Sequence, residues 1–323
     1  MELIFKKLSQ LSASLLFVIL AATTLVLYLS AKPAIEAFGA GFLFETRWGV
    51  EESMLVDGAT DKLDVTDSAE FDDDDFIDDS DEDFVTDDDD ESGSSGTREV
   101  YGALVPIVGT IFSTLIAMLF SIPIAMGIAV FLSEIAASSI AKPVGVAIEL
   151  LASIPSIIYG MWGLFYFGPF IAGIFGGNTV SLLVAGLVLA IMVIPFMAAL
   201  SRDAISTVPD MLKESAYAMG ATKLEVIKDV VFPYAKSGII GSIILSFGRA
   251  MGETMAVAFV IGGVYQFAGK VTDPTNSIPV VLANSFAESS GLSLSVLFYL
   301  ALILFILSFI VIGFAKFYLL RRK

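Results

Sequence analysis

Apolar residues in this sequence gather into long stretches separated by shorter polar segments. A bilayer core about 30 Å thick is crossed by about 20 apolar residues of α-helix. Six stretches reach that length, at about residues 9–31, 103–133, 144–168, 178–200, 237–263 and 293–315. The pattern predicts an all-α polytopic membrane protein. Its predicted parts are a first membrane helix in residues 1–31, an external loop in 32–100 and a membrane core in 101–323.

The first apolar stretch follows Lys6 and Lys7 and so begins like a secretory signal. Its apolar run is longer than the apolar region of a signal peptide, and no A-x-A-like cleavage site comes before Lys32-Pro33. We therefore expect a retained membrane helix.

Lysine and arginine residues orient the predicted spans, because they accumulate in cytoplasmic loops. If the N-terminus lies inside, the inside segments hold twelve basic residues: Lys6, Lys7, Lys142, Arg202, Lys213, Lys223, Lys228, Lys236, Lys316, Arg321, Arg322 and Lys323. The outside segments hold five: Lys32, Arg47, Lys62, Arg98 and Lys270. We expect the chain to lie in the inner membrane of a bacterium, with both termini in the cytoplasm.

Composition excludes several chemistries. The chain is 56% hydrophobic and its mean hydropathy is +0.83, above the apolar content of ordinary soluble domains. It contains no cysteine and therefore no disulfide framework. It also contains no histidine, which excludes a His-ligated zinc site and a His-based catalytic triad. No metal site or catalytic residue is expected.

The net charge of −17 comes from one segment. Residues 57–91 hold 19 of the 35 acidic residues and one of the 18 basic residues, which leaves 16 acidic and 17 basic residues elsewhere. Blocks of like charge repel one another and remain unfolded. We expect a disordered acidic insertion over 57–97 on the outer side. It contains no EF-hand, because Phe84 stands where that loop needs glycine.

The inside segment 201–236 has the pattern of two short helices. Pro209 suits the first turn of one helix and Gly220 the position after its end. Thr222 and Glu225 form a capping box for a second helix that runs to Phe232-Pro233. The first helix carries apolar side chains on the cytoplasmic side, at Met211, Tyr217 and Met219. Such a helix docks into a groove, and periodicity leaves open whether the groove is its own or a partner's.

The same loop has the spacing of a known signature. In order it reads Glu214-Ser215-Ala216, three residues, Gly220, nine residues, Val230, one residue and Phe232-Pro233. This resembles the "EAA" signature of ABC importer permeases, E-A-A, three residues, G, nine residues and I-x-L-P. The sequence departs from it at Ser215, Val230 and Phe232, all by conservative changes.

The resemblance implies the membrane subunit of a type I ABC importer, with the MetI-like fold. In that family this loop forms coupling helices that seat in clefts of the nucleotide-binding subunits. The implied ATPase contact comprises Met211, Glu214, Ser215, Ala216, Gly220, Thr222 and Pro233.

ATP is expected to bind elsewhere. The nearest approach to a phosphate loop is Gly263 followed by Gly269-Lys270-Val271, in which five residues instead of four separate the glycines. Val271 also stands where serine or threonine is needed. No cofactor is therefore expected on this chain, and ATP and Mg would belong to the partner ATPase.

Three further segments resemble the PstC family of phosphate permeases. They are residues 101–106 (YGALVP), 148–163 (IELLASIPSIIYGMWG) and 247–257 (FGRAMGETMAV). The sister PstA family has G-E-T-A-P where this chain has Gly252-Glu253-Thr254-Met255-Ala256, so the PstC resemblance is preferred. It covers almost the whole chain and fails at about 50–97.

The resemblance also implies partners. These are a PstA-like second permease subunit, a PstB-like ATPase dimer and a PstS-like phosphate-binding protein, within a lipid bilayer and without nucleic acid. A permease for another oxyanion or solute is the main alternative. An ion-coupled transporter or a channel would leave the EAA-type loop unexplained.

Arg249 is the main candidate for handling substrate. Counted from Ser237 it lies about 12 residues, or roughly 18 Å, into the fifth predicted span. A charge near mid-membrane costs at least ~2.5 kcal/mol and needs a partner. Glu253, one turn further on, and Glu149, in the third predicted span, are candidate partners, and Thr254 lies beside them. Arg249 either locks helices through a carboxylate or stabilises a transiting oxyanion with its planar donor fork.

Overall fold

The computed structural model describes residues 2–53 and 97–321. The predicted disorder of the acidic insertion falls almost wholly on residues 54–96, outside the described residues. The chain divides into two units, one made of Met1–Trp48 and Tyr101–Lys323 and the other of Gly49–Val100.

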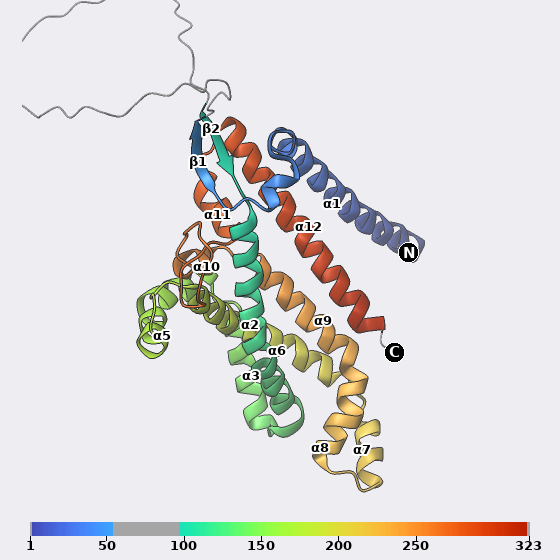
Figure 1. Ribbon diagram of the computed structural model, residues 1–323. Coiled ribbons are helices and arrows are strands. Elements are labelled where there is room, and N and C mark those ends of the chain that lie inside the picture. The colour runs from blue at the N-terminus through green and yellow to red at the C-terminus, as the bar shows by residue number, and fades with distance from the viewer. Residues whose placement is uncertain (1, 54–96, 322–323) are drawn as a thin grey trace, which may run out of the picture. The chain divides into compact units, whose positions relative to one another are not determined.

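The first unit is helical (Figure 1). Its α-helices are α1 (Glu2–Phe38), α2 (Leu104–Val130), α3 (Ser138–Ala152), α4 (Ser156–Trp162), α5 (Gly168–Phe175), α6 (Leu182–Ser206), α7 (Asp210–Ala218), α8 (Lys223–Glu225), α9 (Phe232–Met251), α10 (Met255–Val260), α11 (Ile278–Ser285) and α12 (Gly291–Arg321). A 3₁₀ turn, η1 (Gly39–Leu43), follows α1. Three π-helical segments are η2 (Phe131–Ile135), η3 (Gly163–Phe167) and η4 (Val226–Val231).

Six described helical stretches are long and apolar enough to cross a membrane. They are Phe5–Leu43, Leu104–Ile135, Ser156–Phe175, Leu182–Ser206, Lys223–Met251 and Gly291–Phe317. This number confirms the sequence prediction for the described part of the chain. The boundaries of all six stretches differ from the predicted ones, and the third and fifth stretches are displaced as a whole.

The third predicted span, 144–168, is divided. Pro155 is extended, with φ −56° and ψ 133°, and a proline also disfavours helical backbone at the residue before it. Helix α3 therefore ends at Ala152, and the membrane-length stretch starts at Ser156. As a result Glu149 lies in α3 and not inside a span, so that prediction is wrong.

The fifth predicted span, 237–263, is displaced toward the N-terminus. The π segment η4 runs directly into α9, and Pro233 is the second residue of α9. The helix therefore continues across Pro233 instead of ending there, as we had predicted for the second loop helix. It ends at Met251, before residues Gly252-Glu253-Thr254.

Helix α6 forms the centre of the first unit. It packs against α2, α3 and α9. In its most apolar 18-residue stretch, 67% of the residues are buried inside the protein. The main hydrophobic core gathers on it and includes Val188, Met192 and Met197. Helix α1, by contrast, runs beside α12 (Figure 1), and no residue of its most apolar 18-residue stretch is buried inside the protein. Such an exposed apolar surface suits lipid.

An aromatic cluster lies beside the C-terminal end of α1 and holds together segments that are far apart in the sequence. Within the first unit Trp48 stacks on Tyr265, with ring centroids 5.1 Å apart, and meets Tyr101 edge to face at 5.2 Å. Burial raises the pKa of the Tyr265 phenol, so this tyrosine stays neutral. Tyr299 donates a hydrogen bond to the Gly39 carbonyl at 3.2 Å.

Two short strands, β1 (Trp48–Ser53) and β2 (Thr97–Tyr101), pair as a two-stranded sheet that lies mostly in the second unit. Sequence analysis predicted an external loop here and no strand. Neither strand has the long alternation of apolar and polar residues that identifies a strand in a sequence.

Candidate functional site

The loop between α6 and α9 presents helix α7 with an exposed face. No residue of α7 is buried. Met211 is 75% exposed, and Met219, directly after the helix, is 89% exposed. Pro209 occupies the N-cap position with extended backbone, so it precedes the first turn of the helix instead of forming it as predicted. A short helix with exposed methionines has the character of an adaptable docking surface.

Gly220 ends α7 through its backbone conformation. Its φ is +88°, a region that glycine enters without steric cost. The Gly220 N–H donates to the Tyr217 carbonyl at 2.9 Å, and the Ala221 N–H donates to the Ala216 carbonyl at 3.1 Å. This pair of bonds is a Schellman motif. The predicted helix end at Gly220 is therefore confirmed.

The predicted capping box is present as well. The Glu225 N–H donates to the Thr222 hydroxyl oxygen at 3.4 Å, and the Thr222 N–H donates to the Glu225 carboxylate at 2.7 Å. Together with the Schellman motif it fixes the turn between α7 and α8.

The remaining motif residues have different surroundings. Glu214 is exposed, the Ser215 hydroxyl donates to the Met211 carbonyl at 2.7 Å, and Ala216 packs against a buried cluster. That cluster consists of Ala129, Ile205, Val208, Val226, Val231 and Ala235. One side of α7 thus faces the bundle and the other is free to meet a partner.

A partly buried ion pair also ties α7 to the bundle. The Lys213 Nζ donates to the Glu134 carboxylate at 2.7 Å, and these side chains are 15% and 8% exposed. In the sequence Lys213 stands out only as one of the basic residues of the inside segments, and Glu134 carries no signal. The two residues are 79 positions apart, so no local pattern could have paired them.

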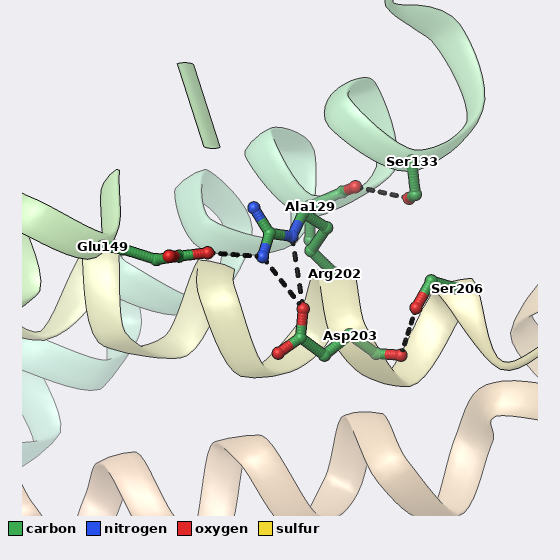
Figure 2. A network of polar contacts seen from close by, with 6 residues as sticks. All are labelled: Ala129, Ser133, Glu149, Arg202, Asp203 and Ser206. Carbon is green, nitrogen blue, oxygen red and sulfur yellow. Dashed lines mark hydrogen bonds and ion pairs between the residues drawn. The ribbon is translucent and has the colours of Figure 1, made fainter. Parts of the chain in front are cut away.

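A second polar network fastens α3 to α6, and Figure 2 shows it. Arg202 donates to the Glu149 carboxylate at 2.8 Å and to the Asp203 carboxylate at 3.0 Å. The guanidinium lies so close to Gly145 of α3 that a Cβ atom there would collide with it. Glu149 is therefore the partner of Arg202 and not of Arg249, which corrects one of the two pairings considered for Arg249.

Arg249 lies two residues before the end of α9 and is half-buried. Its guanidinium carbon lies 5.0 Å from the centroid of the Phe196 ring of α6, within the range of a cation–π interaction. Within the described ranges it forms no ion pair with a carboxylate. The helix lock that sequence analysis considered is thus not formed in this structure. Its contact with Phe196 carries no signal in the sequence.

Glu253 and Thr254 lie in the break between α9 and α10. Glu253 was predicted one turn further along the same helix as Arg249, and that prediction is wrong. The Glu253 carboxylate accepts a hydrogen bond from the Ala256 N–H at 3.2 Å. The Thr254 hydroxyl donates to the Gly252 carbonyl at 3.3 Å. Both side chains thus bond to the backbone at the helix break, and Glu253 does not pair with Arg249.

Helix α10 returns from this break against α4. A Cβ atom at Gly160 would lie 2.9 Å from the Ala256 Cα atom and 3.0 Å from its carbonyl oxygen. The close contact of the two backbones therefore needs glycine at this position. Across residues 2–53 and 97–321, no group of three or more carboxylates gathers to hold a metal ion.

Comparison with known proteins identifies the family. Residues 102–323 match the family described as binding-protein-dependent transport system inner membrane component. The phosphate transport system permease protein PstC of Haemophilus influenzae is 38% identical over 96% of this chain and 90% of that protein. The chain belongs to the PstC family.

Other PstC proteins match over a smaller part of the chain. The Pasteurella multocida protein is 46% identical over 69% of this chain and 76% of its own length. The Xylella fastidiosa (strain 9a5c) protein is 48% identical over 68% of this chain and 74% of its own length.

Solved structures support the fold of the PstC family member. An inward-facing structure of the MetNI methionine ABC transporter (native crystal form) matches with a TM-score of 0.55 and 21% identity, over 67% of this chain and 93% of that chain. A bacterial importer of the polysaccharide alginate matches with a TM-score of 0.53 and 14% identity, over 68% and 79%. At these identities the similarity shows the fold alone, which is the predicted ABC importer permease fold.

Proposed function

We propose that this chain is the membrane-spanning permease subunit of an ATP-driven phosphate importer, with ATP hydrolysis on a separate subunit. The observation that carries the proposal is the 38% identity to a phosphate permease over 96% of the chain. The conformation of the loop supports it, because α7 presents an exposed face whose ends are fixed by a Schellman motif and a capping box.

The partners follow from the same family. A PstA-like permease completes the membrane pathway, and a PstS-like protein delivers phosphate. A PstB-like ATPase dimer, which carries the ATP and Mg, receives the exposed face of α7. This chain binds no cofactor of its own. Its two termini and the α6–α9 loop lie in the cytoplasm, in agreement with the distribution of basic residues.

Arg249 serves the transiting anion. Its guanidinium has no carboxylate partner in the described residues and lies on an aromatic ring, so its hydrogen-bond donors remain available to an oxyanion. Glu253 and Thr254 shape the helix break beside it. Glu149 acts at a distance, by holding α3 on α6.

Uptake of labelled phosphate tests the function. The chain is expressed with its partner subunits in cells that lack their own phosphate importers, and uptake is measured with sulfate, molybdate or methionine as competitor. We expect ATP-dependent phosphate uptake that none of these competitors reduces. Strong competition by another oxyanion, without transport of phosphate, would support the alternative of a permease for that solute.

A further inference from the structure

We propose that the Lys213–Glu134 ion pair is the contact through which α7 moves the junction of α2 and α3, and that both are positioning residues for transport. The inference rests on the proposed function, because it takes α7 as the helix that the ATPase moves. Nothing in the sequence signature points to Glu134, which lies outside the loop.

The Lys213–Glu134 pair is a main contact between α7 and the rest of the chain. Because the helix buries none of its residues, hydrophobic packing alone holds it weakly. The Lys213–Glu134 pair is largely shielded from water and is 2.7 Å long, so solvent screens it little. The second partner of Lys213, Asp210, is 3.7 Å away and 88% exposed, and a pair of that kind contributes little.

The position of Glu134 connects the pair to a backbone break. Glu134 lies in η2, and the two residues after this segment, Ala136 and Ala137, are extended with ψ 140° and 149°. Non-helical residues between two helices are where a chain absorbs the rotation of one element against another. A displacement of α7 that pulls on Glu134 therefore acts directly on the junction with α3.

From this junction, contacts continue to the Arg249 region. Helix α3 is fastened to α6 by the Glu149–Arg202 pair and passes across Pro155 into α4. Helix α4 then packs at Gly160 on α10, which starts just after the break that follows Arg249. Spatial continuity alone does not demonstrate coupling, so the test must measure coupling itself.

The variants Glu134→Gln and Lys213→Met test the proposal in the complete complex, reconstituted in liposomes with its ATPase and binding protein. We expect both to assemble and to hydrolyse ATP, while the phosphate transported per ATP falls about tenfold. Asp210→Asn is the matched control, because it removes the exposed partner of Lys213 and keeps the buried one. It should retain the wild-type ratio.

Two results would overturn the proposal. An unchanged ratio of phosphate to ATP in both variants shows that the pair transmits nothing. Failure of either variant to assemble shows that the pair holds the fold together instead of transmitting movement.

A second measurement does not depend on phosphate. Because the chain has no cysteine, spin labels can be placed through Ser139→Cys in α3 and Phe309→Cys in α12, both exposed. ATP should change the distance between the labels in the otherwise unchanged chain but not with Glu134→Gln added. An equal ATP-dependent change in the label distance with and without Glu134→Gln would overturn the inference. If α3 moves in this way but no phosphate is transported, the proposed function fails and the inference stands.

Discussion

Arg249 shows at the scale of one residue how a charge is kept ready inside a membrane protein. The Phe196 ring lies under its guanidinium, while the two candidate carboxylates bond elsewhere, Glu149 to Arg202 and Glu253 to a backbone N–H. A cation–π contact stabilises the charge without using its in-plane donors. This arrangement favours the anion interpretation over the helix lock.

Substitution of Arg249 separates these roles. We predict that Arg249→Gln inserts and assembles with its partners but takes up no phosphate, and that Arg249→Lys, which keeps the charge and loses the planar fork, is also sharply impaired. Adding Glu253→Gln or Glu149→Gln should not restore uptake, because neither carboxylate pairs with Arg249. Wild-type uptake in either double variant would leave Arg249 as a helix lock. The assay is phosphate uptake alongside the amount of assembled complex.

Gly220 allows a second prediction at this scale. A Cβ atom there would meet nothing within 4 Å, so any effect of substitution comes from its positive φ alone. The left-handed conformation costs a non-glycine residue about 1–2 kcal/mol, and more for a β-branched one. We predict that Gly220→Val loses uptake while all spans insert, and that Gly220→Asn, which tolerates this conformation, keeps most of it. Equal uptake in both variants and wild type would make the loop a mere connector.

Among the helices, the exposed face of α7 is the surface to test for the ATPase. A cysteine introduced at Met211, which is 75% exposed, should cross-link to the nucleotide-binding subunit, since no other cysteine competes. A cysteine at Phe309, exposed on the apolar surface of α12, is the matched control and should not cross-link. Cross-linking from Phe309 alone would contradict the assignment. The measurement is the yield of the linked species on a denaturing gel.

The contact between α4 and α10 depends on Gly160. We predict that Gly160→Ala forces the helices apart, since the new Cβ meets backbone atoms, and lowers the free energy of unfolding by about 1–3 kcal/mol. Gly173→Ala in α5 is the control, because a Cβ there meets nothing within 4 Å. Thermal unfolding of the purified chain in detergent compares the two. Equal stability would show that α4 and α10 are not in close contact.

Local features of these elements could be predicted from the sequence, and long-range ones could not. The capping box and the glycine end of α7 depend on residues a few positions apart. The break at Pro155 was also visible as a proline, yet hydropathy runs across it and predicted one continuous span. The pairs Lys213–Glu134 and Glu149–Arg202 join residues 79 and 53 positions apart. Only tertiary packing, of α7 on η2 and of α3 on α6, brings them together.

For the whole molecule, charge and hydropathy separate a nearly neutral membrane body from one acidic segment. Joining residue 56 to residue 93 removes that segment and leaves strands β1 and β2 intact. Shortening the connection from 43 residues (54–96) to seven changes the entropy cost of closing it by only about 1.6 kcal/mol, in favour of the shorter chain. We predict that the shortened protein inserts and takes up phosphate. Failure to assemble with the second permease subunit would show that the segment is structural.

The paired strands β1 and β2 have a practical consequence. Because they pair with each other, the two strands stay together when residues are added between them, and we expect such additions to leave the helices of the first unit unchanged. The segment between the two strands is therefore a suitable place to insert a peptide. An epitope or a protease site placed there would report from intact cells which side of the membrane this segment faces.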